Sequence, residues 1–206
     1  MPTLLQLDSS ADLVGSRSRA VTAAFAEAWR ARGADHAVVV RDLHRTPVPA
    51  IQDVLLHRAP AARPADAALP AEAIALQQEL LDELLGADVL LIGAPLYNYT
   101  IPASLKAWIE QVHVPGLTAP LAGRPAVVAV ARGAGYDPGT PTEGWDHGSP
   151  LLELLLGTAM GMEVTVLTTS YTLAESLEAL AGFRERARDE LEQAIAAARE
   201  LAGRLG

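Results

Sequence analysis

A polar loop near the start of the sequence holds the residues best suited to bind an anion. Residues 9–18 read Ser-Ser-Ala-Asp-Leu-Val-Gly-Ser-Arg-Ser, and apolar residues at helical spacing follow from Val21. Hydroxyls, an arginine and the free N–H groups of a helix start attract a phosphate. The spacing matches neither a triphosphatase nor a dinucleotide fingerprint, so the phosphate of flavin mononucleotide (FMN) fits better. The alternative is a serine that only caps the helix.

A second loop, residues 95–106, combines two tyrosines and an amide in Tyr97, Asn98 and Tyr99. Together with the backbone of a tight loop, these groups could contact the edge and the face of a planar heterocycle such as isoalloxazine. They could also donate hydrogen bonds to its nitrogens and carbonyls. In the alternative interpretation the tyrosines pack between a sheet and the helix that starts at Pro102. Lys106 is expected to be a solvated helix residue.

The elements that position these loops alternate regularly. Continuous apolar runs predict strands at 3–7, 38–40, 89–93, 126–130 and 163–168, and helical spacing predicts helices at about 18–32, 71–85, 102–112, 149–161 and 181–205. Strands without alternation indicate a parallel sheet that is covered on both faces. Ligands bind such sheets beyond the carboxyl ends of the strands, so the loops after the first, third and fourth strands are the candidate site. Residues 57–70, with prolines at 60, 64 and 70, predict an irregular excursion.

Composition narrows the function classes. The chain has 206 residues and a formal charge of −9, which predicts one domain over 1–206 and argues against nucleic-acid binding. It contains no cysteine, and its five histidines show no ligand spacing, so we expect no disulfide and no metal site. No run of about 18 apolar residues predicts a membrane span, and we expect a cytoplasmic protein.

The segment Ala-Pro-Leu-Tyr-Asn-Tyr-Thr-Ile-Pro-Ala-Ser-Leu-Lys-Ala-Trp-Ile-Glu-Gln-Val at 94–112 resembles the Pro-Met-Tyr-Asn-Phe signature and following helix of FMN-dependent NADH-azoreductases. Further matches lie in the first loop, at 41–49, at 87–89 and at Arg132-Gly133. The resemblance implies an α/β, flavodoxin-like fold of three layers, with a five-stranded parallel sheet flanked by helices. It also implies a homodimer that uses FMN and NADH or NADPH to reduce quinone, azo or other flat conjugated acceptors, without a required catalytic side chain.

The resemblance also implies which residues bind FMN, in three groups. The phosphate would be held by Ser10, Ser16, Arg17 and Ser18. The ring would contact Pro95, Leu96, Tyr97, Asn98 and Tyr99, with the backbone of Asn98 near flavin N5 and O4. The pyrimidine side would be bordered by Ala131, Arg132, Gly133 and Ala134.

Two departures from the family concern the substrate side. Residues 115–123 form a shorter loop without the usual aromatic residues, and Ala131 replaces a serine. The segment 136–148 could line a remodelled pocket, in which Tyr136 and Trp145 would contact substrate. His147 is either a proton donor to the reduced product or a solvated side chain.

Three hypotheses follow. The first is a ping-pong NAD(P)H oxidoreductase that transfers hydride through flavin N5. The second is a flavin-dependent tailoring enzyme of specialised metabolism, acting on one polycyclic or nitrogen-containing intermediate, which the short loop and Ala131 favour. The third is a non-catalytic, flavodoxin-like binding protein that has lost FMN.

Overall fold

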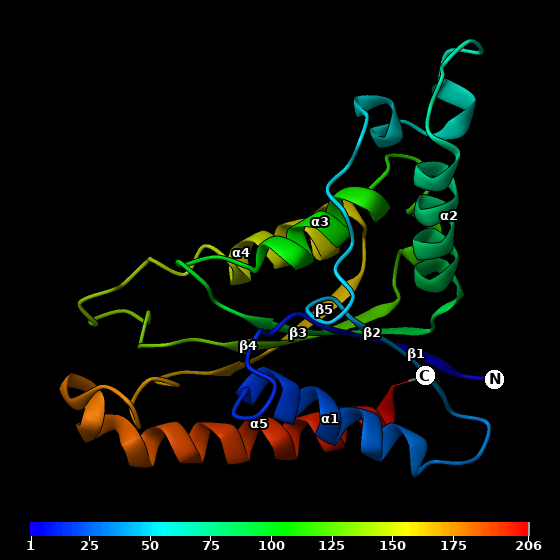
Figure 1. Cartoon of the computed structure of the whole chain (residues 1–206). Coiled ribbons are helices and arrows are strands. Elements are labelled where there is room, and N and C mark those ends of the chain that lie inside the picture. The colour runs from blue at the N-terminus through cyan, green and yellow to red at the C-terminus, as the bar shows by residue number, and fades with distance from the viewer. Residues whose placement is uncertain (206) are drawn as a thin grey trace.

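A parallel sheet of five strands forms the middle layer of the computed structural model, which describes residues 1–205 (Figure 1). The strand order is β2-β1-β3-β4-β5. The strands are β1 Thr3–Asp8, β2 Ala37–Asp42, β3 Val89–Pro95, β4 Pro125–Ala131 and β5 Glu163–Thr169. Every residue of β3 is buried, as its unbroken apolar run predicts for a central strand. The predicted three-layer fold is confirmed.

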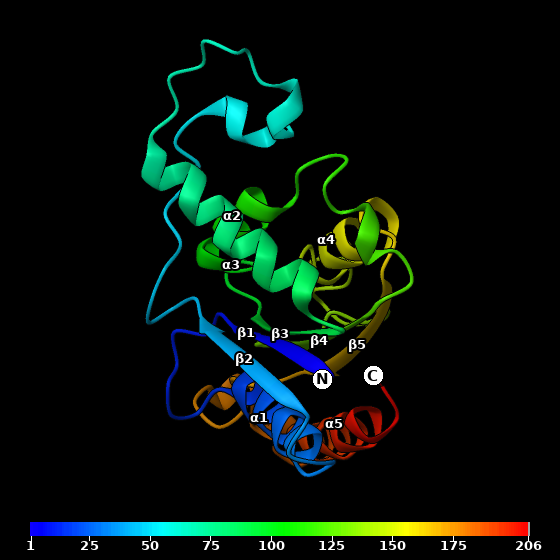
Figure 2. The same cartoon turned by 90° about the vertical axis from the view of Figure 1, so that its right-hand side faces the viewer.

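Helices cover both faces of this sheet (Figures 1 and 2). On one face lie α1 Arg17–Arg30 and α5 Arg184–Arg204, and on the other lie α2 Ala71–Gly86, α3 Ala103–Val112 and α4 Ser149–Leu152. Phe25 and Trp29 of α1 pack with the alanines of α5 beneath the sheet. Small side chains at 194, 198 and 202 let α5 approach closely, so both helices share one apolar layer.

Two predicted helices differ from the structure. The helix predicted over 149–161 begins as α4 but continues as a π-helix, η4 Glu153–Ala159, whose hydrogen bonds span five residues instead of four. The last helix begins at Arg184 instead of 181, after the 3-10 segment η5 Glu178–Phe183. There the ring of Phe183 stacks on Tyr171 at 4.2 Å and 5°, and this tertiary contact accompanies the later start. The excursion at 57–70 is mainly irregular, as predicted, with short 3-10 turns η1 Val54–His57 and η2 Pro60–Ala62. Another 3-10 turn, η3 Ala119–Leu121, lies between α3 and β4.

The strand order reverses at β1, which pairs with β2 on one side and β3 on the other. The loops after β1 and β3 therefore leave the sheet beside each other. Ser9 donates from its N–H and hydroxyl to the Gly93 carbonyl, at 3.2 and 2.7 Å. A Cβ on Gly93 would lie 2.7 Å from Asp8 Oδ1, so only glycine permits this close approach. The fold thus joins the first polar loop to the strand that carries the second.

Candidate active site

A pocket of about 310 Å³ lies at the carboxyl end of the sheet, where the loops after β1, β3, β4 and β5 meet. Its lining residues are Ser10, Asp12, Gly15, Ser16, Arg17, Pro95, Tyr97, Ala131, Thr172, Leu173 and Ser176. The structure therefore brings parts of all three predicted loops together. Sequence reasoning missed the contribution of residues 172–176, although a run of hydroxyl residues at a strand end was a usable signal.

Hydrogen bonds within the first loop fix its conformation. The Asp12 carboxylate accepts the N–H groups of Val14 and Gly15 at 2.9 and 2.8 Å, and these hydrogen bonds lower the pKa of Asp12. Ser16 is the N-cap of α1 and accepts the Arg19 N–H at 3.3 Å. Ser18 is buried, and its hydroxyl lies 3.2 Å from that of Ser16. The capping role of Ser16 is compatible with anion binding, because the first N–H groups of a helix have no intrahelical partner.

Arg17 lines the pocket but is tethered elsewhere. Its Nη1 donates to the Ala187 carbonyl of α5 at 2.5 Å, and burial lowers the pKa of Arg17. The guanidinium therefore ties the start of α1 to the start of α5. Its role at the phosphate stays a prediction.

A second arginine, which sequence reasoning missed, fixes the end of the first loop. Arg19 donates twice to the Asp42 carboxylate, at 2.8 and 2.9 Å, and twice to the Ser10 carbonyl, at 3.2 and 2.8 Å. Burial opposes ionisation of Asp42, but the hydrogen bonds from Arg19 and from the Arg45 N–H lower the pKa of Asp42 to about 2. Burial raises the pKa of the neighbouring Asp8. Arg19 thus couples the loop to β2.

The Arg19–Asp42 ion pair makes the stability of the fold depend on pH. Because the Asp42 pKa falls from 3.8 to about 2 on folding, its stabilising effect is complete above pH 5, falls to about half by pH 3 and continues to fall below that. We expect Asp42→Asn to lower the free energy of unfolding at pH 7 by about 1–2 kcal/mol after allowance for solvent screening. The difference from the parent protein should shrink toward pH 3 in urea denaturation. Arg45→Met is the control, because Arg45 is exposed and pairs with Asp42 only at 3.4 Å.

The second loop is a strained turn. Tyr97 N–H donates to the Thr100 carbonyl at 2.8 Å, and Thr100 N–H donates back at 3.2 Å. Between them Asn98 and Tyr99 have φ values of 50° and 70°. Left-handed backbone at two successive non-glycine residues costs free energy and persists only where the surroundings hold it. The turn projects its backbone beyond the end of β3.

Tyr97 connects this turn to the first loop. Its hydroxyl accepts the Ala11 N–H at 3.0 Å and lies 3.3 Å from the Ser10 hydroxyl. Tyr97 and Tyr99 are 38% and 45% exposed, so neither ring is enclosed between the sheet and α3. This exposure argues against the packing alternative.

The segment after β4 brings further aromatic rings to the turn. Tyr99 meets Trp145 edge-on at 5.2 Å and Tyr136 at 6.4 Å, and burial together with Tyr99 raises the pKa of Tyr136. The His147 N–H donates to the Tyr99 carbonyl at 2.8 Å. Residues 136, 145 and 147, which the sequence placed on the substrate side, thus gather beside the second loop.

The third loop is divided between two environments. Ala131 lines the pocket, whereas Ala134 lines a separate cavity of about 490 Å³ beside Tyr171 and Phe183. A Cβ on Gly133 would lie 2.9 Å from Leu173 Cδ1, so the backbone passes closely there. Arg132 is buried and bonds to Ser170 and Asp137. The roles of Arg132, Gly133 and Ala134 at a flavin stay predictions.

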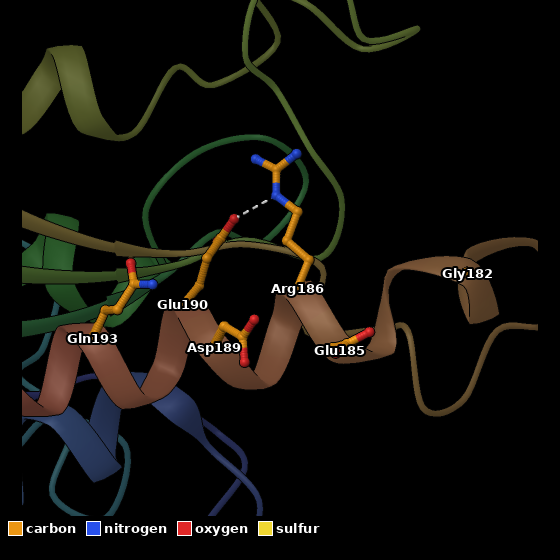
Figure 3. A pocket seen from close by; sticks show the side chains of 6 residues that line it. All are labelled: Gly182, Glu185, Arg186, Asp189, Glu190 and Gln193. Carbon is orange, nitrogen blue, oxygen red and sulfur yellow. Dashed lines mark hydrogen bonds and ion pairs between the residues drawn. The ribbon is translucent and has the colours of Figure 1, made fainter.

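A further hollow of about 500 Å³ runs along α5 (Figure 3). It is lined by Gly182, Glu185, Arg186, Asp189, Glu190 and Gln193. The hollow is lined by three carboxylates and one guanidinium, and Glu190 accepts a hydrogen bond from that guanidinium at 2.8 Å. This surface would repel a phosphate, unlike the pocket at the end of the sheet.

Across residues 1–205, no group of three or more His, Cys, Asp or Glu side chains is placed to hold a metal ion. None of the helices in this range combines the length and apolar character needed to cross a bilayer.

The sequence is similar to a known family and to named proteins over nearly its full length. Residues 2–199 match the family described as having a flavodoxin-like fold. A Kineococcus radiotolerans protein named FMN-dependent NADH:quinone oxidoreductase is 57% identical, with 98% of this chain and 99% of that protein aligned. The chain belongs to this family of oxidoreductases. A Streptomyces coelicolor protein of the same name is 39% identical over 100% of this chain and 97% of its own length.

Solved structures agree on the fold of this family member. An FMN-dependent NADH-azoreductase from Bacillus anthracis, in complex with FMN, superimposes with a TM-score of 0.80 at 20% identity, covering 98% of this chain and 100% of that one. A second azoreductase structure from that species gives 0.81 at 19% identity, covering 100% of both chains. The family resemblance found in the segment 94–112 is confirmed.

Proposed function

We propose that this protein is an FMN-dependent NADH oxidoreductase that reduces quinone, azo or similar flat conjugated acceptors. The observation that carries the proposal is the joined arrangement of a hydroxyl-rich pocket at the α1 N-terminus and the strained Asn98–Tyr99 turn, linked through Tyr97. The named activity of relatives up to 57% identical supports it.

The residues fit the cofactor at both ends. Ser10, Ser16 and the first N–H groups of α1 supply neutral donors and a positive helix dipole for a phosphate. The exposed turn presents backbone groups and tyrosine rings to a planar heterocycle. When bound, FMN accepts hydride from NADH and passes reducing equivalents to the acceptor. The protein would bind and orient the reactants in turn, in a ping-pong sequence for which no catalytic side chain is required.

The experiment is an FMN titration of the purified chain, followed by NADH oxidation with a simple benzoquinone. We expect a flavin absorption band that travels with the protein and quinone-dependent NADH consumption. A protein that stays colourless would support the non-catalytic hypothesis. A protein that binds FMN but leaves simple quinones unreduced would support the tailoring enzyme.

We propose that the Trp145 and Tyr136 rings form an aromatic wall for the acceptor. Trp145 is 46% exposed and stands edge-on to Tyr99, while residues 115–123 supply no aromatic side chain. We expect Trp145→Ala to raise KM for a naphthoquinone about tenfold, because a stacking partner contributes roughly 0.5–1.5 kcal/mol beyond its area. KM for NADH-dependent reduction of the smaller benzoquinone should change less than threefold. Trp145→Phe, which keeps a ring, is the control, and equal losses for both quinones would contradict the wall. His147 lies beside it and is proposed as proton donor.

We also propose a homodimer. The second loop, α3 and α4 border an apolar groove of about 590 Å³ that includes Ile101, Pro102, Ala103 and Leu151. Beyond it Leu154 is 56% exposed, and a second copy would cover these apolar groups. Sedimentation should give twice the chain mass, and Leu154→Glu should shift it toward the monomer. A monomer of the parent chain would end this part of the proposal.

We place the enzyme in the cytoplasm, in keeping with its lack of cysteine.

A further inference from the structure

A single buried arginine contacts three other side chains, at positions 137, 146 and 170. Arg132 follows β4, and its side chain is 11% exposed. It donates to the Ser170 hydroxyl from Nη2 at 2.7 Å and from Nε at 3.3 Å, and to Asp137 Oδ1 at 3.0 Å. Its Nη1 lies 3.6 Å from Asp146 Oδ2. The planar guanidinium therefore uses all three nitrogens, which a lysine ammonium could not reproduce.

Asp146 passes this constraint to the start of α4. Its carboxylate accepts the N–H groups of Gly148 and Ser149 at 3.0 and 2.8 Å and the Ser149 hydroxyl at 2.7 Å. His147 lies between these fixed residues and donates its N–H to the Tyr99 carbonyl. A Cβ on Gly148 would lie 3.1 Å from Leu96 Cδ1 and 3.4 Å from the Thr100 carbonyl carbon. The backbone at 147–148 is thus pressed against the second loop.

We propose that Arg132 is a positioning residue that, through Asp146, holds the His147 N–H on the Tyr99 carbonyl and so maintains the left-handed Asn98–Tyr99 turn. Positive φ at two non-glycine residues needs external support, and this hydrogen bond supplies it. Removing one partner of this ion pair would leave the other charge buried and unpaired, so the pair favours the loop conformation in which both charges meet. An effect of Arg132 on FMN binding rests on the proposed function. Its effect on the geometry of the turn does not.

The test is amide hydrogen exchange of the full-length chain, followed by NMR without added FMN. In Arg132→Met we expect exchange of the His147 amide to accelerate at least tenfold, while the Leu91 amide of the central strand keeps its rate. Arg132→Lys should restore part of the protection of the His147 amide, because lysine keeps the positive charge but lacks the planar guanidinium with its several donors. Arg186→Met is the matched control. Arg186 also contacts Asp137, at 3.4 Å, but points with Glu190 from the surface of α5 (Figure 3). It should leave the His147 amide unchanged.

A second variant keeps the test decisive if Arg132→Met fails to fold. Asp146→Asn retains an acceptor for the cap of α4 and removes the charge that faces Arg132. We expect faster His147 exchange and an FMN Kd raised about fivefold to tenfold. In the double variant the effects should not add, because both changes break one connection. Parent-like His147 exchange in both single variants would overturn the proposal. Absence of FMN binding in the parent chain would instead count against the proposed function, and leaves the exchange result valid.

Discussion

Replacing Ser16 by aspartate should weaken FMN binding about 100-fold and leave the fold intact. Ser16 lines the pocket and caps α1 through its side-chain oxygen. Aspartate caps helices as well as serine does, so the helix start should survive. A carboxylate within about 4 Å of a phosphate, at a partly screened surface, costs roughly 2–4 kcal/mol, and about 2.7 kcal/mol corresponds to a 100-fold change in Kd.

The measurement compares FMN with riboflavin, which has the same ring but no phosphate. Riboflavin affinity should be nearly unchanged in Ser16→Asp, and the loss for FMN should shrink as salt is added. Ser16→Asn is the matched control, because asparagine caps the helix without a charge. Equal losses for both flavins would show that the phosphate does not lie at the start of α1.

The positions of the loops were predictable because the strand pattern is unusually clear. Val89–Gly93 and Ala126–Val130 contain no alternation of polar and apolar residues, and only strands buried on both faces accommodate such runs. Once the sheet is parallel, the loops after its strands must share one edge. The meeting of the Ser16 loop with the Tyr97 turn also requires β1 to lie next to β3, as it does in the observed strand order.

The hydrogen bonds and ion pairs that hold the site together were harder to predict, because they join residues that are distant in sequence. Arg17 is a reasonable phosphate ligand by type and place, yet the Ala187 carbonyl accepts its guanidinium 170 residues later. The network of Asp8, Arg19 and Asp42 forms only because β1 pairs with β2 and α1 crosses them. Pairwise side-chain contacts of this kind leave no periodic signal in one sequence.

The strained turn is an intermediate case. Asparagine tolerates the left-handed region, so Asn98 offered a hint, but tyrosine at position 99 gave none. The groups that contact Tyr99 include the His147 N–H and the Trp145 ring. Both belong to a loop without regular structure, which hydrophobic periodicity cannot place.

The second large effect is expected from substitutions of Asn98 in this turn. A β-branched residue fits poorly at the observed φ of 50°, so Asn98→Val should lower the free energy of unfolding by about 1–2 kcal/mol. Loss of the turn geometry should also weaken FMN binding about tenfold or more. Glycine adopts positive φ without a steric cost, so Asn98→Gly should stay within about 0.5 kcal/mol of the parent protein, because relief of strain offsets the entropy of the unfolded chain.

The pair of variants separates backbone from side chain at this position. If the backbone of Asn98 faces the flavin, Asn98→Gly should keep the FMN Kd within about threefold of the parent value, because it preserves the turn and removes only the amide. Thr100→Val is the control for an apolar valine side chain in the same turn, since Thr100 has no positive φ and its two hydrogen bonds to Tyr97 use the main chain. It should behave like the parent in both denaturation and FMN titration. Similar losses of affinity in Asn98→Gly and Asn98→Val would assign the contact to the amide side chain and refute the backbone role.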